Sequence, residues 1–112
     1  IKNVTAQKAR RVDLVIGVSY GDDVEKVEKV LEEILAADER ILTDPPPVIR
    51  LHELGDSSVN FIVRPWASRE DFWNVYWDTL RAIKIRFDQE GITIPFPQRD
   101  VHLYPSNGVD PA

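Results

Sequence analysis

One long amphipathic stretch, residues 68–91, constrains the fold of this chain more than any other part of its sequence. Its apolar residues recur at steps of three and four, which predicts a single stripe along an α-helix: Phe72, Tyr76, Leu80, Ile83 and Phe87. Ser68 is placed to cap the first turn, with Asp71 three residues later, and Gly91 to end the helix in a left-handed conformation. Because a helix with one apolar stripe buries it against another element, we expect this helix to pack on a sheet.

Two tryptophans on the same helix are not explained by that stripe. Trp73 and Trp77 form a second ridge, rotated by about 100° from Phe72 and Tyr76. One packing face does not need both ridges, so we expect a further surface to cover the tryptophans. Two interpretations are open at this point: contact with another subunit, or completion of the core of the same chain.

Length and charge set the broad class. The 112 residues suffice for one domain with a core, and the net charge of −5 gives little attraction to nucleic acid, which we do not expect as a partner. There is no cysteine for disulfide or thiol chemistry, no signal-peptide pattern, and no apolar run long enough to cross a bilayer. The sequence contains no methionine, so we expect it to be part of a longer chain.

The residues before the long helix alternate between strand and helix periodicity. Residues 12–20 alternate apolar and polar side chains, which predicts a strand with one strongly apolar face. The helical period then continues to about Ala37, with Asp22 and Glu25 placed as a capping-box-like pair. A stiff run of three prolines, residues 45–47, leads to the next strand.

A hairpin is predicted from residues 48–54 and 59–66, joined by a turn at residues 55–58. Pro65 cannot donate a ladder hydrogen bond, so the second strand should end there or lie at an edge. One face is apolar and includes Phe61, which we expect under the helices. The other face carries polar side chains: Arg50, His52, Asn60 and Arg64.

Two short strands are expected after the long helix, at residues 92–94 and 100–104, separated by Pro95 and Pro97. The complete order is strand, helix, strand, strand, helix, strand. This order is typical of the α+β ferredoxin-like βαββαβ fold, an antiparallel sheet with two helices on one face. The final strand, residues 100–104, would be an addition to that fold.

Residues for catalysis or cofactor binding are not found together. No glycine-rich phosphate loop is present, and the two serines at residues 57–58 lie in a turn without a neighbouring base. His52 and His102 are the only histidines, and without cysteine they do not predict a metal site. We therefore expect no enzyme activity, no cofactor and no metal.

Four segments together resemble the cytoplasmic C-terminal region of the small-conductance mechanosensitive channels, the MscS family. They are IGVSY in the first strand, LHELGDSSVNFIVRPW across the hairpin, NVYWDTLRAIKIRFDQEGI on the helix, and IPFPQRDVHL near the end. The most specific pattern is Gly-Ile-x-Ile-Pro-Phe-Pro-Gln at residues 91–98. The resemblance extends over about residues 1–103 and implies a non-catalytic domain of an ion channel that responds to osmotic stress.

The family architecture implies a place for each part of the chain. Residues 1–11 would end an upstream β domain, residues 12–97 would form the α/β domain, and residues 98–112 a barrel strand and tail. Seven subunits form a hollow cage with openings between them on the cytoplasmic side of the inner membrane. The partner is therefore a homoheptamer, and the membrane is reached through upstream helices absent from this soluble fragment. The cage would support assembly, filter solutes and help to set the gating state.

The resemblance also suggests roles for nine residues. It implies a subunit interface at Trp73, Trp77, Val101 and Leu103, the last two in the barrel strand. It implies that five cations set the charge of the cage and its openings: Lys8, Arg10, Arg11, Arg50 and Arg64.

Two alternatives come from other functional classes. A stand-alone ferredoxin-like ligand-binding regulatory module would use the same architecture. A small hydrolase of the acylphosphatase type would need an arginine in a glycine-rich loop after the first strand, where residues 19–23 supply two aspartates instead. Apolar segments of about 20 residues upstream of Ile1 would decide for the channel.

Overall fold

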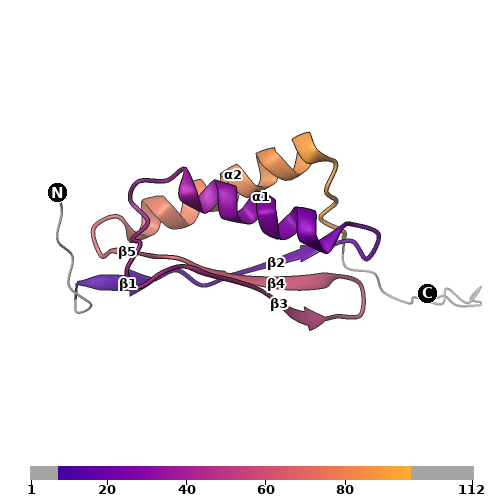
Figure 1. Ribbon diagram of the computed structural model, residues 1–112, viewed down its shortest axis with the longest axis horizontal. Coiled ribbons are helices and arrows are strands. Elements are labelled where there is room, and N and C mark those ends of the chain that lie inside the picture. Colours follow the sequence, from indigo (N-terminus) through magenta and orange to yellow (C-terminus); the bar gives the residue numbers. More distant parts are fainter. Residues whose placement is uncertain (1–7, 97–112) are drawn as a thin grey trace, which may run out of the picture.

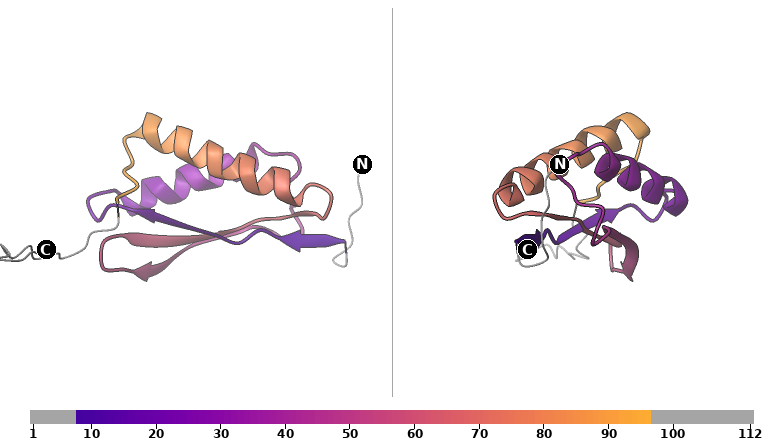
Figure 2. Two further views of the ribbon diagram at one scale, coloured as in Figure 1. Left: turned by 180° about the vertical axis from the view of Figure 1, so that it is seen from behind. Right: turned by 60° about the vertical axis from the view of Figure 1, so that its left-hand side comes forward.

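The computed structural model describes residues 8–96, which form two helices and five short antiparallel strands in two sheets (Figure 1). In chain order the elements are β1 (Ala9–Arg11), β2 (Leu14–Val18), α1 (Val24–Ala36), β3 (Val48–Leu54), β4 (Val59–Arg64), β5 (Trp66–Ser68) and α2 (Phe72–Glu90). Both helices cover the same face of the strand layer, as predicted, and the opposite face is left open (Figure 2).

The two sheets share two chain segments, because β1 leads into β2 and β4 leads into β5. The larger sheet has the order β2-β4-β3, and the smaller sheet pairs β1 with β5. Pro65 separates β4 from β5, which confirms that the predicted second hairpin strand ends at this residue. The Pro65 carbonyl still accepts a hydrogen bond from the Val12 amide at 2.8 Å, so the two segments stay together across the break.

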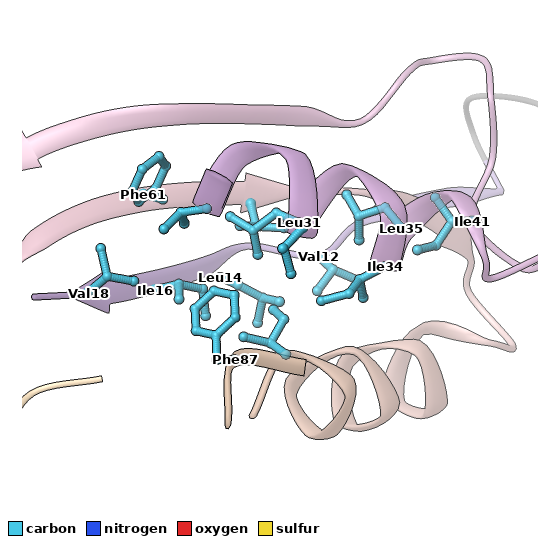
Figure 3. Close-up of a cluster of buried hydrophobic side chains, with 14 of the residues drawn as sticks. Val12, Leu14, Ile16, Val18, Leu31, Ile34, Leu35, Ile41, Phe61 and Phe87 are labelled. Atoms are coloured by element: carbon cyan, nitrogen blue, oxygen red, sulfur yellow. The ribbon is translucent and has the colours of Figure 1, made fainter. Parts of the chain in front are cut away.

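The core lies between the helices and the covered face of the larger sheet (Figure 3). Phe61 is fully buried on β4, as predicted, and Phe87 of α2 reaches the side chains of β2. Alternation in β2 sends Leu14, Ile16 and Val18 into this core. On the open face Val15 is 69% exposed, because no other element within residues 8–96 packs over it.

Two details of the predicted long helix are wrong at its start. The helix begins at Phe72, with Asp71 at the N-cap, rather than near Ser68. Ser68 belongs to β5, and its carbonyl and hydroxyl oxygens accept hydrogen bonds from the Asp71 amide at 3.0 and 3.3 Å. The strand pairing of β5 with β1 extends to this residue and so delays the helix. Gly91 ends the helix with a φ of 73°, as predicted.

The buried stripe of α2 is rotated from the predicted one. Its buried residues are Phe72, Val75, Thr79, Ile83 and Phe87. Tyr76 is only half-buried, and Leu80 is 38% exposed. Because α2 packs against α1 as well as the sheet, its buried arc turns toward α1 and takes in Val75 and Thr79.

The predicted capping pair of α1 is also wrong. Asp23 is the N-cap, and its carboxylate accepts a hydrogen bond from the Glu25 amide at 3.0 Å. Asp22 instead binds two backbone amides, because its Oδ2 accepts hydrogen bonds from Ser19 at 3.2 Å and from Thr93 at 3.0 Å. It thereby joins the end of β2 to the segment that follows α2.

The predicted strand at residues 92–94 is not formed. The Thr93 carbonyl accepts one backbone hydrogen bond from the segment after β2, donated by the Ser19 amide at 3.0 Å. The Thr93 amide donates to Asp22 instead of a strand, and Pro95 follows two residues later without a donor. The larger sheet therefore has three strands rather than the expected four. The last predicted strand, residues 100–104, lies outside the described residues.

Candidate functional site

An exposed apolar ridge on α2 is the main surface feature that the chain leaves uncovered. We call Trp73, Trp77 and Leu80 the Trp ridge; their exposed fractions are 51%, 58% and 38%. The two indoles stack at 5.7 Å between ring centroids, and Trp73 also lies 5.5 Å from Tyr76. These contacts hold the rings in place, but the exposure shows that neither indole completes the core of this chain.

The ridge lies on the side of α2 that faces away from α1. Asp78 and Arg86, on the other side of α2, both contact residues of α1 or the loop after it. Figure 2 shows the two helices side by side, so the outer side of α2 has no neighbour in the helix layer. The sequence therefore located the ridge, and the structure places it at the edge of the domain.

Polar contacts join the two helices on their inner sides. Arg86 donates to Glu33 at 2.8 Å, and Arg40 donates to Asp78 at 3.0 Å while also pairing with Asp38. The hydrogen bond from Arg86 lowers the pKa of Glu33, and the hydrogen bond from Arg40 lowers the pKa of Asp38. We call these contacts the α1–α2 seam.

Sequence reasoning missed the seam. Charged side chains on an amphipathic helix ordinarily face solvent, yet Glu33 reaches across to α2. Glu33 and Arg86 are 53 positions apart, so no local pattern could reveal the pair. Only the crossing of two helices over the sheet brings such residues together.

Two of the five candidate cage cations share one carboxylate. Arg11 donates to Asp13 at 2.6 and 3.3 Å, and Arg64 approaches the same carboxylate at 3.8 Å. This group lies where β1 continues into β2, beside the end of β4. Asp13 offsets part of the positive charge, a role that the sequence interpretation did not assign to it.

The other three candidate cations lie apart from this group. The Arg10 guanidinium packs over the Phe72 ring at 3.9 Å from its centroid, so α2 positions it. Arg50 lies on β3 opposite Ile62, on the open sheet face as expected, and donates to its neighbour's carbonyl at 2.9 Å. Lys8 precedes β1 and is exposed. Val101 and Leu103, the remaining candidates, lie outside the described residues.

A groove of about 640 Å³ lies on the outer side of α1, over β3. Its apolar lining is Leu35, Ala36, Ile41, Leu42, Pro47 and Ile49. Its charged groups are Glu32, Asp38, Glu39 and Arg50. Within residues 8–96 no group of three or more His, Cys, Asp or Glu side chains could hold a metal ion. His52 lies at the irregularity in the β3–β4 pairing and does not line the groove.

In the part of the chain that the structure describes, neither helix is long and apolar enough to cross a membrane.

Residues 12–94 match the family described as "Mechanosensitive ion channel MscS, C-terminal". The chain belongs to this family. This confirms the resemblance predicted from the sequence, and it identifies the C-terminal domain of a channel family rather than an enzyme family.

Curated relatives agree with this family. An uncharacterized MscS family protein of Synechocystis sp. is 48% identical over 103 residues, which cover 92% of this chain and 35% of the relative. The small-conductance mechanosensitive channel of Edwardsiella ictaluri is 45% identical over 104 residues, which cover 93% of this chain and 36% of the relative. The chain thus spans about a third of the length of the relatives it matches.

Solved MscS structures share the fold. The closed-state structure of Helicobacter pylori MscS has a TM-score of 0.77 and 36% identity, covering 87% of this chain and 39% of that chain. The plant protein MSL1 of Arabidopsis thaliana has a TM-score of 0.68, with 14% identity over 80% of this chain and 35% of that chain, and is similar in fold alone.

Proposed function

We propose that this chain is a non-catalytic cage domain of a mechanosensitive channel, placed on the cytoplasmic side of the inner membrane. The match of residues 12–94 to the C-terminal MscS domain carries the proposal. The cage would support oligomer assembly, filter solutes and contribute to control of the gating state. In this proposal residues 1–11 end an upstream β domain and residues 98–112 form the barrel strand and tail.

The assembly role rests on the Trp ridge. Large aromatic side chains are common anchors of subunit contacts, and here about half of each indole remains exposed. We propose that Trp73 and Trp77 lie at a boundary between subunits of a heptamer. Val101 and Leu103 would add contacts in the barrel, and without upstream domains we expect the chain to associate only weakly in dilute solution.

We also propose that the fold is ferredoxin-like, with a fourth strand position left incomplete. The order β2-β4-β3 corresponds to the first, third and second strands of that fold. One backbone hydrogen bond joins residues 92–94 to Ser19, the residue after β2, at the position where a fourth strand would pair. Asp22 holds this segment and so substitutes for part of the missing ladder.

A chimera tests the channel assignment directly. In it this chain replaces the matched third of the Edwardsiella ictaluri channel, which is 45% identical over that region. We expect tension-activated currents in reconstituted membrane patches. A correctly inserted chimera that conducts nothing under tension, while the parent channel does, would contradict the cage assignment.

The filtering role makes a prediction about charge. In the same chimera Arg64→Glu should move the reversal potential under a salt gradient toward cation preference, and Asp13→Asn should move it the opposite way. Fixed charge acts within a Debye length of about 8 Å, so both changes must lie near the ion path to have an effect. Lys29→Glu on the exposed side of α1 is the matched control. Reversal potentials equal in all variants would exclude Arg64 and Asp13 from the filter.

The stand-alone regulatory module is the second candidate, favoured only by the groove over β3. Apolar segments of about 20 residues encoded upstream of Ile1 would argue against it.

A further inference from the structure

The Trp ridge and the groove of the α1–β3 edge lie on opposite sides of the helix layer. Glu33 of α1 contacts α2, whereas Glu32 and Leu35, about 100° and 200° around the same helix from Glu33, line the groove. On α2 the seam residue Asp78 and the ridge residue Trp77 are likewise about 100° apart around the helix. One edge of the domain therefore projects an apolar ridge, and the other edge is hollowed.

The two edges also match in chemistry. The groove, at about 640 Å³, has the size of pockets that enclose drug-sized ligands, so it has room for indole side chains. Six apolar residues line it, and Glu32 and Glu39 stand at its margin.

The groove is lined by three acidic side chains, Glu32, Asp38 and Glu39, and by one cation, Arg50, so its charge is mainly negative. Arg81 lies one helical turn beyond Trp77 and is exposed. Arg81, Glu32 and Glu39 form no ion pair with any residue in the range 8–96. An arginine beside the ridge and two glutamates beside the groove would thus meet if the ridge of one copy entered the groove of another.

We propose that the occupant of the groove is a second copy of this chain, which inserts its Trp ridge with Trp77 as the main anchor. The contact joins two different surfaces of the same chain, so it leaves one ridge and one groove free at the ends. A head-to-tail contact of this kind forms a ring where its rotation closes, as the proposed cage requires. The inference rests on the proposed function in one respect: copies of the chain must associate.

Pairs of introduced cysteines test this contact. The chain contains no cysteine of its own, so cross-links form only between the introduced thiols. The variant Asn74→Cys with Ala36→Cys keeps both indoles and places one thiol beside the ridge, next to Trp73, and one on an exposed position of the groove. With a short bismaleimide at high protein concentration, we expect a ladder of cross-linked dimers, trimers and larger species. Asn74→Cys alone should give no dimer above background. A strong dimer from that single variant would indicate a symmetric ridge-to-ridge contact and would overturn the proposal.

The matched control is Asn74→Cys with Val15→Cys, since Val15 is 69% exposed but lies on the open sheet face. This pair should give at least about fivefold less ladder than the groove pair. Adding Arg81→Glu to the groove pair should lower its yield severalfold, and adding Glu32→Arg as well should restore it. Equal ladders from the groove and control pairs would overturn the assignment of the groove.

Sedimentation of the cysteine-free chain at the same concentration separates two kinds of failure. Association without a ladder from the groove pair overturns the groove contact alone and leaves the proposed cage intact. A strict monomer without any ladder overturns the groove contact and also counts against assembly through this domain.

Discussion

The two sides of α2 are built from different chemistry. The side that faces α1 is joined by ion pairs, and its cations and carboxylates find partners within the same chain. The opposite side carries two stacked indoles with about half of their surface in water. One helix is thus complete on one side and incomplete on the other. The comparison indicates that the inner side serves the fold and the outer side serves contact with another molecule.

The largest effect should come from emptying the buried face of α2 that packs on the sheet. Phe87 is fully buried near the end of α2, so Phe87→Ala should lower the free energy of unfolding by about 3–5 kcal/mol. Trp77→Ala, on the same helix, should cost no more than about 1 kcal/mol because much of the indole is already exposed. Urea denaturation measures both. Equal losses would mean that the ridge belongs to the core, and the comparison would fail.

The next effect concerns association rather than folding. Trp73→Ala and Trp77→Ala should each weaken self-association by about 2 kcal/mol, or roughly thirtyfold in the dissociation constant, as expected for an aromatic anchor. Sedimentation equilibrium at several protein concentrations provides the measurement. Gln89→Ala, at an exposed position on another side of α2, is the control. Unchanged association in both tryptophan variants would remove the ridge from the interface.

The seam should show a smaller effect that depends on pH. Arg40→Gln removes the partner that lowers the pKa of Asp38 from its ordinary value of 3.8, and we expect a loss of up to about 1 kcal/mol at pH 7. Since the carboxyl binds its proton less readily when folded, this stability is present above its unfolded pKa and is lost as pH falls through the folded pKa. The wild-type and variant unfolding curves should therefore converge in acid. A gap that stays constant down to about pH 2 would exclude this linkage.

The smallest effect is that of salt. The ion pairs of the seam are partly exposed, so raising the salt concentration should reduce the difference between wild type and Arg40→Gln by a few tenths of a kcal/mol. Apolar association through the ridge should not weaken to the same extent. Chemical denaturation by urea at low and high NaCl tests the first statement, and sedimentation tests the second.

Local sequence signals determined much of this protein. The two-residue period placed the apolar face of β2, and the three- and four-residue steps located both helices. Gly91 ended α2 and Pro65 ended β4 because each acts through its own backbone, without help from distant residues. The second ridge at Trp73 and Trp77 and membership of the MscS family were likewise predicted from the residues, whereas the exposure of that ridge came from the structure.

Only the tertiary structure decided which side of each element found a partner. Val75 and Thr79 are buried because α1 lies beside α2, and a periodicity count that favoured Tyr76 and Leu80 could not register that neighbour. The amide of Thr93 bonds to Asp22, 71 positions away, and this bond takes the place of a fourth strand. Helix and strand periods depend on neighbours along the chain, whereas these contacts depend on how separate elements cross, which the sequence of either element does not encode alone.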